Sequence, residues 1–266
     1  MNLLYFDFES SESKAFLVVV SCLVWTTICT LLESTIKFKT LTKKADHDVK
    51  NRFVSIIHGL VVMALAGYSL FHDQPSYTAK NSDVQIFVLL ISMGYFIYDL
   101  LACIYYKICD RALVIHHSLA VFGYFISVYF GNSTLAMCGI FYGETSNSFM
   151  HIRAMLRVAG KRHTKLYELM EVVYMLTYII ARGVCITKIN YDTALNSEIP
   201  FLLRFACLAL WLQSLFFIKE MLGILQKKIL QHKERRVKSV DYYWFSENPK
   251  VETLSYFRKA GKEKVF

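Results

Sequence analysis

The stretch AFLVVVSCLVWTTICTLL, residues 15–32, decides the fold class of this 266-residue chain. It contains no charged side chain, and it lacks the polar residues that recur on every turn of a helix at the surface of a soluble protein. Its length approaches the ~20 apolar residues that cross the hydrocarbon core of a bilayer. A cleaved signal peptide is not expected, because an acidic segment precedes the stretch and a basic loop follows it directly. The stretch therefore predicts a membrane-spanning helix.

Six further apolar blocks predict an all-α, multi-pass transmembrane bundle of about seven spans. Charged residues make up 19% of the chain, below the ~25% that is usual in soluble domains. The predicted spans are 15–32, 53–71, 84–107, 112–130, 133–152, 168–188 and 200–225. The predicted regions are a lumenal or extracellular N-terminus at 1–14, the first span with a basic cytosolic loop at 15–52, a six-helix membrane domain at 53–225 and a basic cytosolic tail at 226–266.

Basic residues alternate between the two ends of the predicted spans. Six lie in the 33–52 loop, five lie in 153–165 and eleven lie in the tail, whereas the opposite connections carry few, such as Lys14 and Lys80. The positive-inside rule therefore places the C-terminus in the cytosol and the N-terminus in the lumen or outside the cell. An odd number of spans requires the same arrangement.

The tail mixes basic clusters with aromatic side chains, among them Tyr243 and Trp244. Two interpretations remain open: a solvated, disordered tail, or contact with anionic headgroups, to which each basic residue contributes on the order of 1 kcal/mol. The solvated form is expected after residue 245. Lys262 and Lys264 in the final KEKVF resemble the dilysine signal by which coat proteins return membrane proteins to the endoplasmic reticulum. That organelle is the expected location, with the plasma membrane as the alternative and coat proteins as candidate partners.

Several kinds of site are not expected from this sequence. The seven cysteines lie in or beside apolar blocks and form no CxxC pair, so neither a disulfide framework nor a zinc site is predicted. The single HH pair, His116 and His117, does not supply the several histidine boxes of a diiron hydroxylase. We expect no metal and no cofactor. The net charge of +9 follows the membrane topology, so we expect no nucleic-acid partner.

Ionisable and amide side chains interrupt the predicted spans, where such groups are expensive and usually functional. Glu144, Asn147 and His151 recur at i, i+3 and i+7, which places them on one helix face. We expect the polar residues to share an inward-facing pocket, because burying them separately in lipid would cost several kcal/mol. The principal candidates are Asp99, His116, His117, Glu144 and Asn147, and the secondary candidates are His58, Ser146, His151 and Arg182.

Simpler structural roles remain open for some of these residues. Asp99 and Arg182 would neutralise each other, or would separately pair with histidine or glutamate side chains, within the bundle. His58 and His151 lie near predicted cytosolic ends, where either would be hydrated. Gln213 would form a hydrogen bond between two helices, which contributes about 1 kcal/mol in a membrane.

Residues 115–147, IHHSLAVFGYFISVYFGNSTLAMCGIFYGETSN, resemble the TLC family of multi-pass membrane proteins. The resemblance extends from about His58 through Gln213, and its further anchors are GYFIYDL (94–100), GETSNSFMHIR (143–153) and IIARGVC (179–185). It is closest to the small TLC-domain-containing proteins, in particular the subgroup numbered five. It implies a six-helix TLC barrel, usually with an additional N-terminal span.

The same comparison separates this chain from the ceramide synthases of the family, which carry HH followed by an HDxSD-type motif. In register, Gly143 replaces the histidine, Glu144 replaces the first aspartate, Ser146 matches the serine and Asn147 replaces the last aspartate. The loss of one histidine and one carboxylate disfavours synthase chemistry. The chain is more similar to the non-synthase members, which are associated with membrane lipid homeostasis.

Three functions are therefore weighed. The favoured one is a protein that binds membrane lipid in an internal polar pocket and contributes to phospholipid or sphingolipid homeostasis. The alternative is an acyltransferase with acyl-CoA as its substrate, in which His116 or His117 is the general base or acyl carrier and Glu144 or Asp99 orients it. A seven-span receptor is disfavoured, because motifs of the DRY and NPxxY type are missing. Both lipid hypotheses require the polar side chains to face one chamber.

Overall fold

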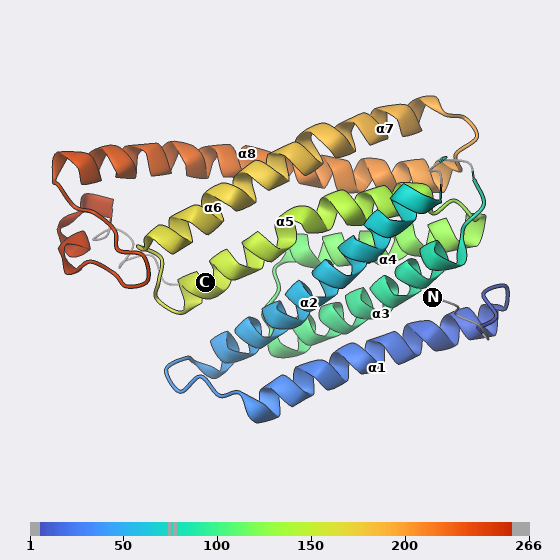
Figure 1. Ribbon diagram of the computed structural model, residues 1–266, viewed down its shortest axis with the longest axis horizontal. Coiled ribbons are helices and arrows are strands. Elements are labelled where there is room, and N and C mark those ends of the chain that lie inside the picture. Colours follow the sequence, from blue (N-terminus) through green and yellow to red (C-terminus); the bar gives the residue numbers. More distant parts are fainter. Residues whose placement is uncertain (1–5, 74–75, 77–78, 257–266) are drawn as a thin grey trace.

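The computed structural model describes residues 6–73, 76 and 79–256, and it is a bundle of long helices (Figure 1). The described residues form no strand. The helices are α1 (Ser11–Thr35), α2 (Lys43–His72), α3 (Asp83–Tyr106), α4 (Arg111–Phe130), α5 (Thr134–Val158), α6 (Lys165–Tyr178), the π-helical turn η1 (Ile179–Cys185), α7 (Ile186–Leu195), α8 (Phe201–Val237) and the 3₁₀ turn η2 (Pro249–Thr253). The predicted all-α, multi-pass architecture is confirmed.

Within the described part of the chain, six helical runs are long and apolar enough to cross a membrane: α1, α2, α3, α4, the continuous run from Lys165 to Leu195, and α8. The predicted span at 133–152 corresponds to α5, which is also of membrane length but too polar to belong to this set. Its polarity has a physical reason, because α5 packs along α2 on one side and α6 on the other. Most of the surface of α5 is therefore covered by neighbouring helices.

Six of the helical runs form a closed ring, and α1 lies outside it. The order around the ring, from the packing of neighbours, is α2, α5, the α6–η1–α7 run, α8, α4 and α3, which returns to α2. Helix α1 packs mainly on α3 and lies at the edge of the bundle (Figure 1). The Ser21 hydroxyl donates to the Ile91 carbonyl at 2.8 Å, and Trp25 is buried beside it. The barrel with one additional N-terminal helix, as the resemblance implied, is confirmed.

Short connections join α3 to α4 and α4 to α5. Helix α3 begins with a capping box between Ser82 and Gln85 and ends at Lys107 in the left-handed conformation. Asp110 caps α4 by accepting from the Leu113 amide at 2.8 Å. Gly131, with a φ of 76°, ends α4, a conformation that glycine adopts without strain. The caps therefore place His116 and His117 in the second turn of α4.

The C-terminal tail differs from the sequence-based expectation. Helix α8 continues through residue 225 to Val237, and residues 238–256 fold back onto the start of α6 (Figure 1). Val251 and Leu254 are 1% and 0% exposed, so the expectation of a disordered tail after residue 245 was wrong for residues 246–256, although many of their side chains are exposed. Apolar side chains at 240, 242, 251 and 254 give this segment a small core of its own. Lys262 and Lys264 lie outside the described residues.

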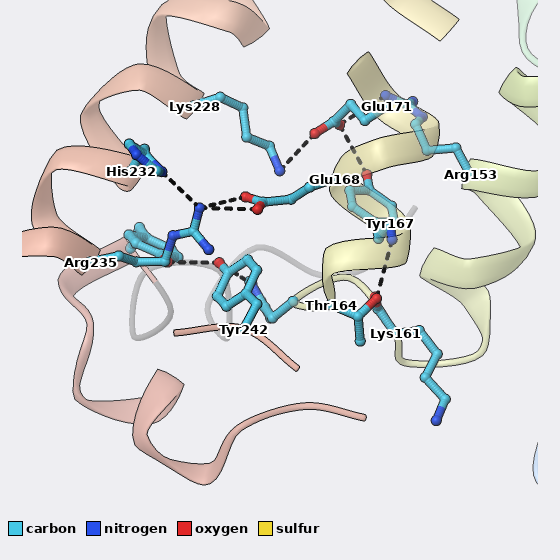
Figure 2. A network of polar contacts seen from close by, with 12 residues as sticks. Arg153, Lys161, Thr164, Tyr167, Glu168, Glu171, Lys228, His232, Arg235 and Tyr242 are labelled. Atoms are coloured by element: carbon cyan, nitrogen blue, oxygen red, sulfur yellow. Dashed lines mark hydrogen bonds and ion pairs between the residues drawn. The ribbon is translucent and has the colours of Figure 1, made fainter. Parts of the chain in front are cut away.

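A network of ion pairs attaches the tail to the bundle (Figure 2). Arg235 donates to both carboxylate oxygens of Glu168, at 2.8 and 3.0 Å, while its guanidinium lies 3.8 Å from the Tyr242 ring centroid. Two turns earlier on α8, Lys228 pairs at 2.7 Å with Glu171, which lies one turn beyond Glu168 on α6. Because these contacts join α6, α8 and the tail, the end of the ring at which α6 begins is cross-linked by charge.

Docking of the tail is expected to weaken between pH 6.5 and pH 5. Burial lowers the pKa of His163 to about 4, helped by the cations of Arg162, Lys228 and Arg235, and its Nδ1 lies 3.2 Å from the Tyr242 hydroxyl. A histidine with a lowered folded pKa stabilises the fold above its unfolded pKa, near 6.5, and that contribution is lost as pH falls. The hydrogen-exchange protection factors of residues 238–256, corrected for the pH dependence of the intrinsic exchange rate, should be lower at pH 5 than at pH 7. His163→Gln should show no such change; an equal loss of protection in both proteins would contradict this role.

Candidate functional site

The ring encloses a polar cavity of about 310 Å³. Its walls come from α2, α3, α4, α5, α6, η1 and α8. Eight predicted site residues line it: His58, Asp99, His116, His117, Glu144, Asn147, His151 and Arg182. Ser146 does not, because its side chain is fully buried elsewhere on α5 and donates to the Gly143 carbonyl at 3.4 Å. The structure thus gathers the predicted polar residues around one chamber, apart from Ser146.

Asp99 and His117 form the most buried polar pair of the chamber. Oδ2 of Asp99 lies 3.2 Å from Nδ1 of His117, and the two side chains are 5% and 7% exposed. The contact is an ion-pair distance without the alignment of a hydrogen bond. The other carboxylate oxygen accepts from the amide of Asn51, whose own Oδ1 accepts from the Tyr98 hydroxyl at 2.7 Å. The carboxylate is therefore fixed from one side and faces an imidazole on the other.

Asn51 and Tyr98 were missed by sequence reasoning. Asn51 lies seven residues before His58, and Ser55 lies between them at i+4, so all three share one face of α2. That polar spacing would have identified Asn51 if α2 had been followed to its true start. The predicted span began at 53 and left it in the loop. Tyr98 gives no such signal, since a tyrosine in an aromatic-rich span is unremarkable.

The adjacent histidines point to different partners. Consecutive side chains on a helix are about 100° apart, so His117 faces Asp99 on α3 while His116 faces α8. Nδ1 of His116 lies 3.2 Å from Oε1 of Gln213, and the Gln213 amide donates to the Ala112 carbonyl at 2.8 Å. Gln213 thus forms the expected bond between helices. The two imidazoles have distinct environments within one cavity.

Glu144, Asn147 and Arg182 form a second polar group on the opposite wall. The Asn147 amide donates to Oε2 of Glu144 at 3.0 Å, and Nη2 of Arg182 donates to Oδ1 of Asn147 at 3.4 Å and to the Gly143 carbonyl at 3.1 Å. Arg182 comes from the π-helical turn η1, a distortion that is often found at functional sites. Neutralisation of Asp99 by Arg182 does not occur, because each has other partners.

Gly59 creates the space that Glu144 occupies. A Cβ atom at residue 59 would lie 2.5 Å from Oε2 of Glu144, which is closer than a Cβ atom and an oxygen atom approach in proteins. The carboxylate of α5 therefore approaches the backbone of α2 only because residue 59 has no side chain. Sequence reasoning singled out neighbouring His58 and passed over this glycine.

His58 and His151 differ in their surroundings. His58 is 1% exposed and stacks on Tyr95 with ring centroids 3.6 Å apart, so the alternative that it is hydrated at a span end was wrong. His151 lies at the end of the chamber nearer the basic loops, with Nδ1 3.5 Å from Nη1 of Arg52. Arg52 in turn pairs with Asp48 at 2.9 Å. That end of the chamber is consequently charged on several sides.

A second cavity of about 110 Å³ adjoins the polar chamber. Both cavities are lined by His116, Glu144 and Arg182. The remaining walls are mostly small or apolar, and they include Gly139 and Leu203. These residues come from the half of the bundle near the α4–α5 turn, away from Arg52 and Asp48. The combined space is polar at one end and apolar at the other, which matches an amphiphilic ligand.

Within the residues that the structure describes, no group of three or more His, Cys, Asp or Glu side chains is arranged to hold a metal ion. The seven cysteines carry free thiols, and none of them pairs with another. The side chains that line the chamber present imidazole, carboxylate, amide, guanidinium, hydroxyl and thiol groups.

The same region of the chain is recognised by a protein-family model. The TRAM–LAG1–CLN8 model, described as the TLC domain, matches residues 48–225. Every residue that lines the two cavities falls within this match.

Proposed function

The chain belongs to the TLC domain family and is a multi-pass membrane protein, and we propose that it binds a membrane lipid inside the ring and thereby contributes to lipid homeostasis. The observation that carries this proposal is the junction of the polar chamber with the apolar cavity at His116, Glu144 and Arg182. A lipid presents the same two parts, a polar headgroup and a hydrocarbon chain. Phospholipids and sphingolipids are the classes in view.

The polar half of the site suits a headgroup that both donates and accepts hydrogen bonds. Glu144 has an amide partner in Asn147, and Arg182 contacts only oxygen atoms and the Tyr178 ring. Among the described contacts, Glu144 and Arg182 form no ion pair with each other, so each can still bind a charged group of a ligand. The apolar half would accept the first part of an acyl chain.

Gly139→Leu is expected to abolish lipid retention. Residue 139 lines the apolar cavity, and a Cβ atom there meets nothing within 4 Å, so a side chain can be introduced at this position, and we expect the leucine to take up space that an acyl chain would occupy. Lipid that co-purifies with the detergent-solubilised protein should be measured by mass spectrometry. Gly223→Leu is the matched control, since residue 223 also has open space around its Cβ position but lines neither cavity. Equal lipid content in both variants would refute the proposal.

A second candidate function is acyl transfer from acyl-CoA, and the Asp99–His117 pair specifically favours it. A buried carboxylate 3.2 Å from Nδ1 of an imidazole stabilises the protonated form of that imidazole, which is one of the roles of the carboxylate in hydrolytic triads. The His117 imidazole would take a proton from an acceptor hydroxyl or amine as that group attacks the thioester carbonyl. The carbon–sulfur bond then breaks, and the departing thiolate receives the proton. No cofactor is required for this step.

The membrane location and orientation are part of the proposal. The α1–α2 connection, the α5–α6 connection and the tail lie at the same end of the bundle (Figure 1), and these are the segments rich in lysine and arginine. The positive-inside rule then favours a cytosolic C-terminus and a lumenal N-terminus. We propose that the protein resides in the endoplasmic reticulum and that coat proteins bind its tail. Within the family, we propose that it is related to the small TLC-domain-containing proteins of subgroup five.

A further inference from the structure

Three consecutive aromatic side chains, Tyr243, Trp244 and Phe245, are exposed at the start of the folded tail. Their exposed fractions are 51%, 52% and 71%. They are called the aromatic triad below. Exposed apolar side chains elsewhere lie mainly on the spanning helices, where acyl chains cover them. The triad follows the last span, and in water three adjacent exposed aromatic rings are costly.

The backbone of the aromatic triad is held firmly against the bundle. The amide of Lys165, the first residue of α6, donates to the Tyr243 carbonyl at 2.8 Å, and the next amide, of Leu166, donates to the Trp244 carbonyl at 3.4 Å. Nζ of Lys161 donates to the Phe245 carbonyl at 2.7 Å. Two of the unpaired amides that open every helix are thereby satisfied. The tail turns its carbonyls inward and leaves the three rings outside.

The position of the aromatic triad relative to the membrane can be inferred from the residues that it contacts on α6. Leu169, only four residues beyond Lys165, is already 44% exposed, and Val172 is 50% exposed, so both present apolar surface to lipid. With a rise of 1.5 Å per residue, the triad lies about 6 Å outside this apolar surface. That depth is the headgroup region, where tryptophan and tyrosine gather in membrane proteins.

Two lysine side chains lie beside the aromatic triad: Nζ of Lys165 is 6.0 Å from the centre of the Trp244 ring, and Lys161 donates to the Phe245 carbonyl. Arg157, in the last turn of α5, and Arg162, on the connection between α5 and α6, are exposed as well. We propose that the aromatic triad and these basic residues form an interfacial site for anionic phospholipid headgroups of the adjoining leaflet. The rings enter between headgroups while the cations pair with phosphate or carboxylate groups. The site is separate from the chamber and does not rest on its proposed function.

The test follows the fluorescence of Trp244 in the reconstituted full-length chain. The difference between wild type and Trp244→Phe isolates its emission from that of Trp25 and Trp211. Vesicles of phosphatidylcholine alone are compared with vesicles that also contain phosphatidylserine, with acrylamide as the aqueous quencher. Phosphatidylserine should shift the emission to shorter wavelength and reduce quenching severalfold. High salt should reverse part of the protection, because exposed charges are screened.

A pair of matched charge variants tests the anionic assignment. In vesicles that contain phosphatidylserine, the double variant Arg157→Gln/Arg162→Gln should lower the ratio of acrylamide-protected to acrylamide-accessible Trp244 by about fivefold per arginine. Lys37→Gln/Lys39→Gln removes the same charge from the exposed α1–α2 connection and should change nothing. Three outcomes would overturn the proposal: acrylamide quenching that is equal in both vesicles, protection that is already complete in detergent, and equal effects of the two double variants.

Discussion

Turnover of acyl-CoA by the purified protein is expected to fall by about 10²–10⁴-fold in His117→Ala if the acyl-transfer function holds. His117 is the imidazole that faces Asp99, at 3.2 Å, whereas His116 faces the amide of Gln213. A carboxylate stabilises the imidazolium that forms when a base accepts a proton, and a neutral amide does so much less. His116→Ala should consequently retain more turnover than His117→Ala.

The measurement is release of free thiol from acyl-CoA in the presence of extracted membrane lipids. Asp99→Asn is the companion variant, because it preserves the volume and the Asn51 contact but removes the charge next to His117. Thermal melting of each variant shows whether the fold persists. Turnover in His117→Ala equal to that of the wild type would exclude this histidine as the base. If the wild type shows no turnover but retains lipid, the acyl-transfer candidate falls and the binding function stands.

Gly94→Leu is expected to detach α1 from the ring. A Cβ atom at residue 94 would lie 2.5 Å from Cβ of Ser21 and 2.6 Å from the Val18 carbonyl oxygen. The second of these atoms is backbone, so no rotation of a side chain relieves the clash and the whole helix must move. Overpacking of this kind costs about 1–3 kcal/mol, and separation also breaks the bond from Ser21 to the Ile91 carbonyl.

Detachment can be measured after cleavage at a protease site placed in the α1–α2 connection. In the wild type, α1 should co-purify with the rest of the chain, and in Gly94→Leu it should be lost. Gly223→Leu is again the control, because its Cβ position is open. The ring closes without α1, so retained lipid should survive in the cleaved variant. Co-purification of α1 at the wild-type level would show that the close approach at Gly94 is dispensable.

The sequence predicted the features that depend on local pattern. Long apolar blocks identified the spans, and the shared face of Glu144 and Asn147 placed α5 along the chamber. Features that depend on contacts between distant segments were missed. Asn51 and Gly59 matter because of what α3 and α5 place opposite them, at Asp99 and Glu144. Residues near Gly59 in the sequence give no sign of this contact, whereas Asn51 shares a helix face with Ser55 and His58, a signal that was lost because the predicted span began at residue 53.

The tail shows the same distinction. Its basic, polar composition is that of a solvated segment, and the four buried apolar residues at 240, 242, 251 and 254 follow no helical or strand period. They become a core only because the chain turns back after Val237 and meets α6. In the sequence, Arg235 is one of several cations in a basic segment. Only the structure shows that it contacts both Glu168 and Tyr242.

The polarity of α5 has a consequence for biogenesis. A nascent helix that carries Glu144 and Arg153 near or within its apolar stretch partitions poorly from the translocon into lipid on its own, since a single ionised residue near the centre of a span costs about 2.5–3.5 kcal/mol at insertion. Helix α2 is synthesised first and offers the gap at Gly59 that receives the Glu144 carboxylate. We therefore expect α5 to enter the membrane together with helices that were synthesised before it. The order of synthesis thus contributes to membrane integration.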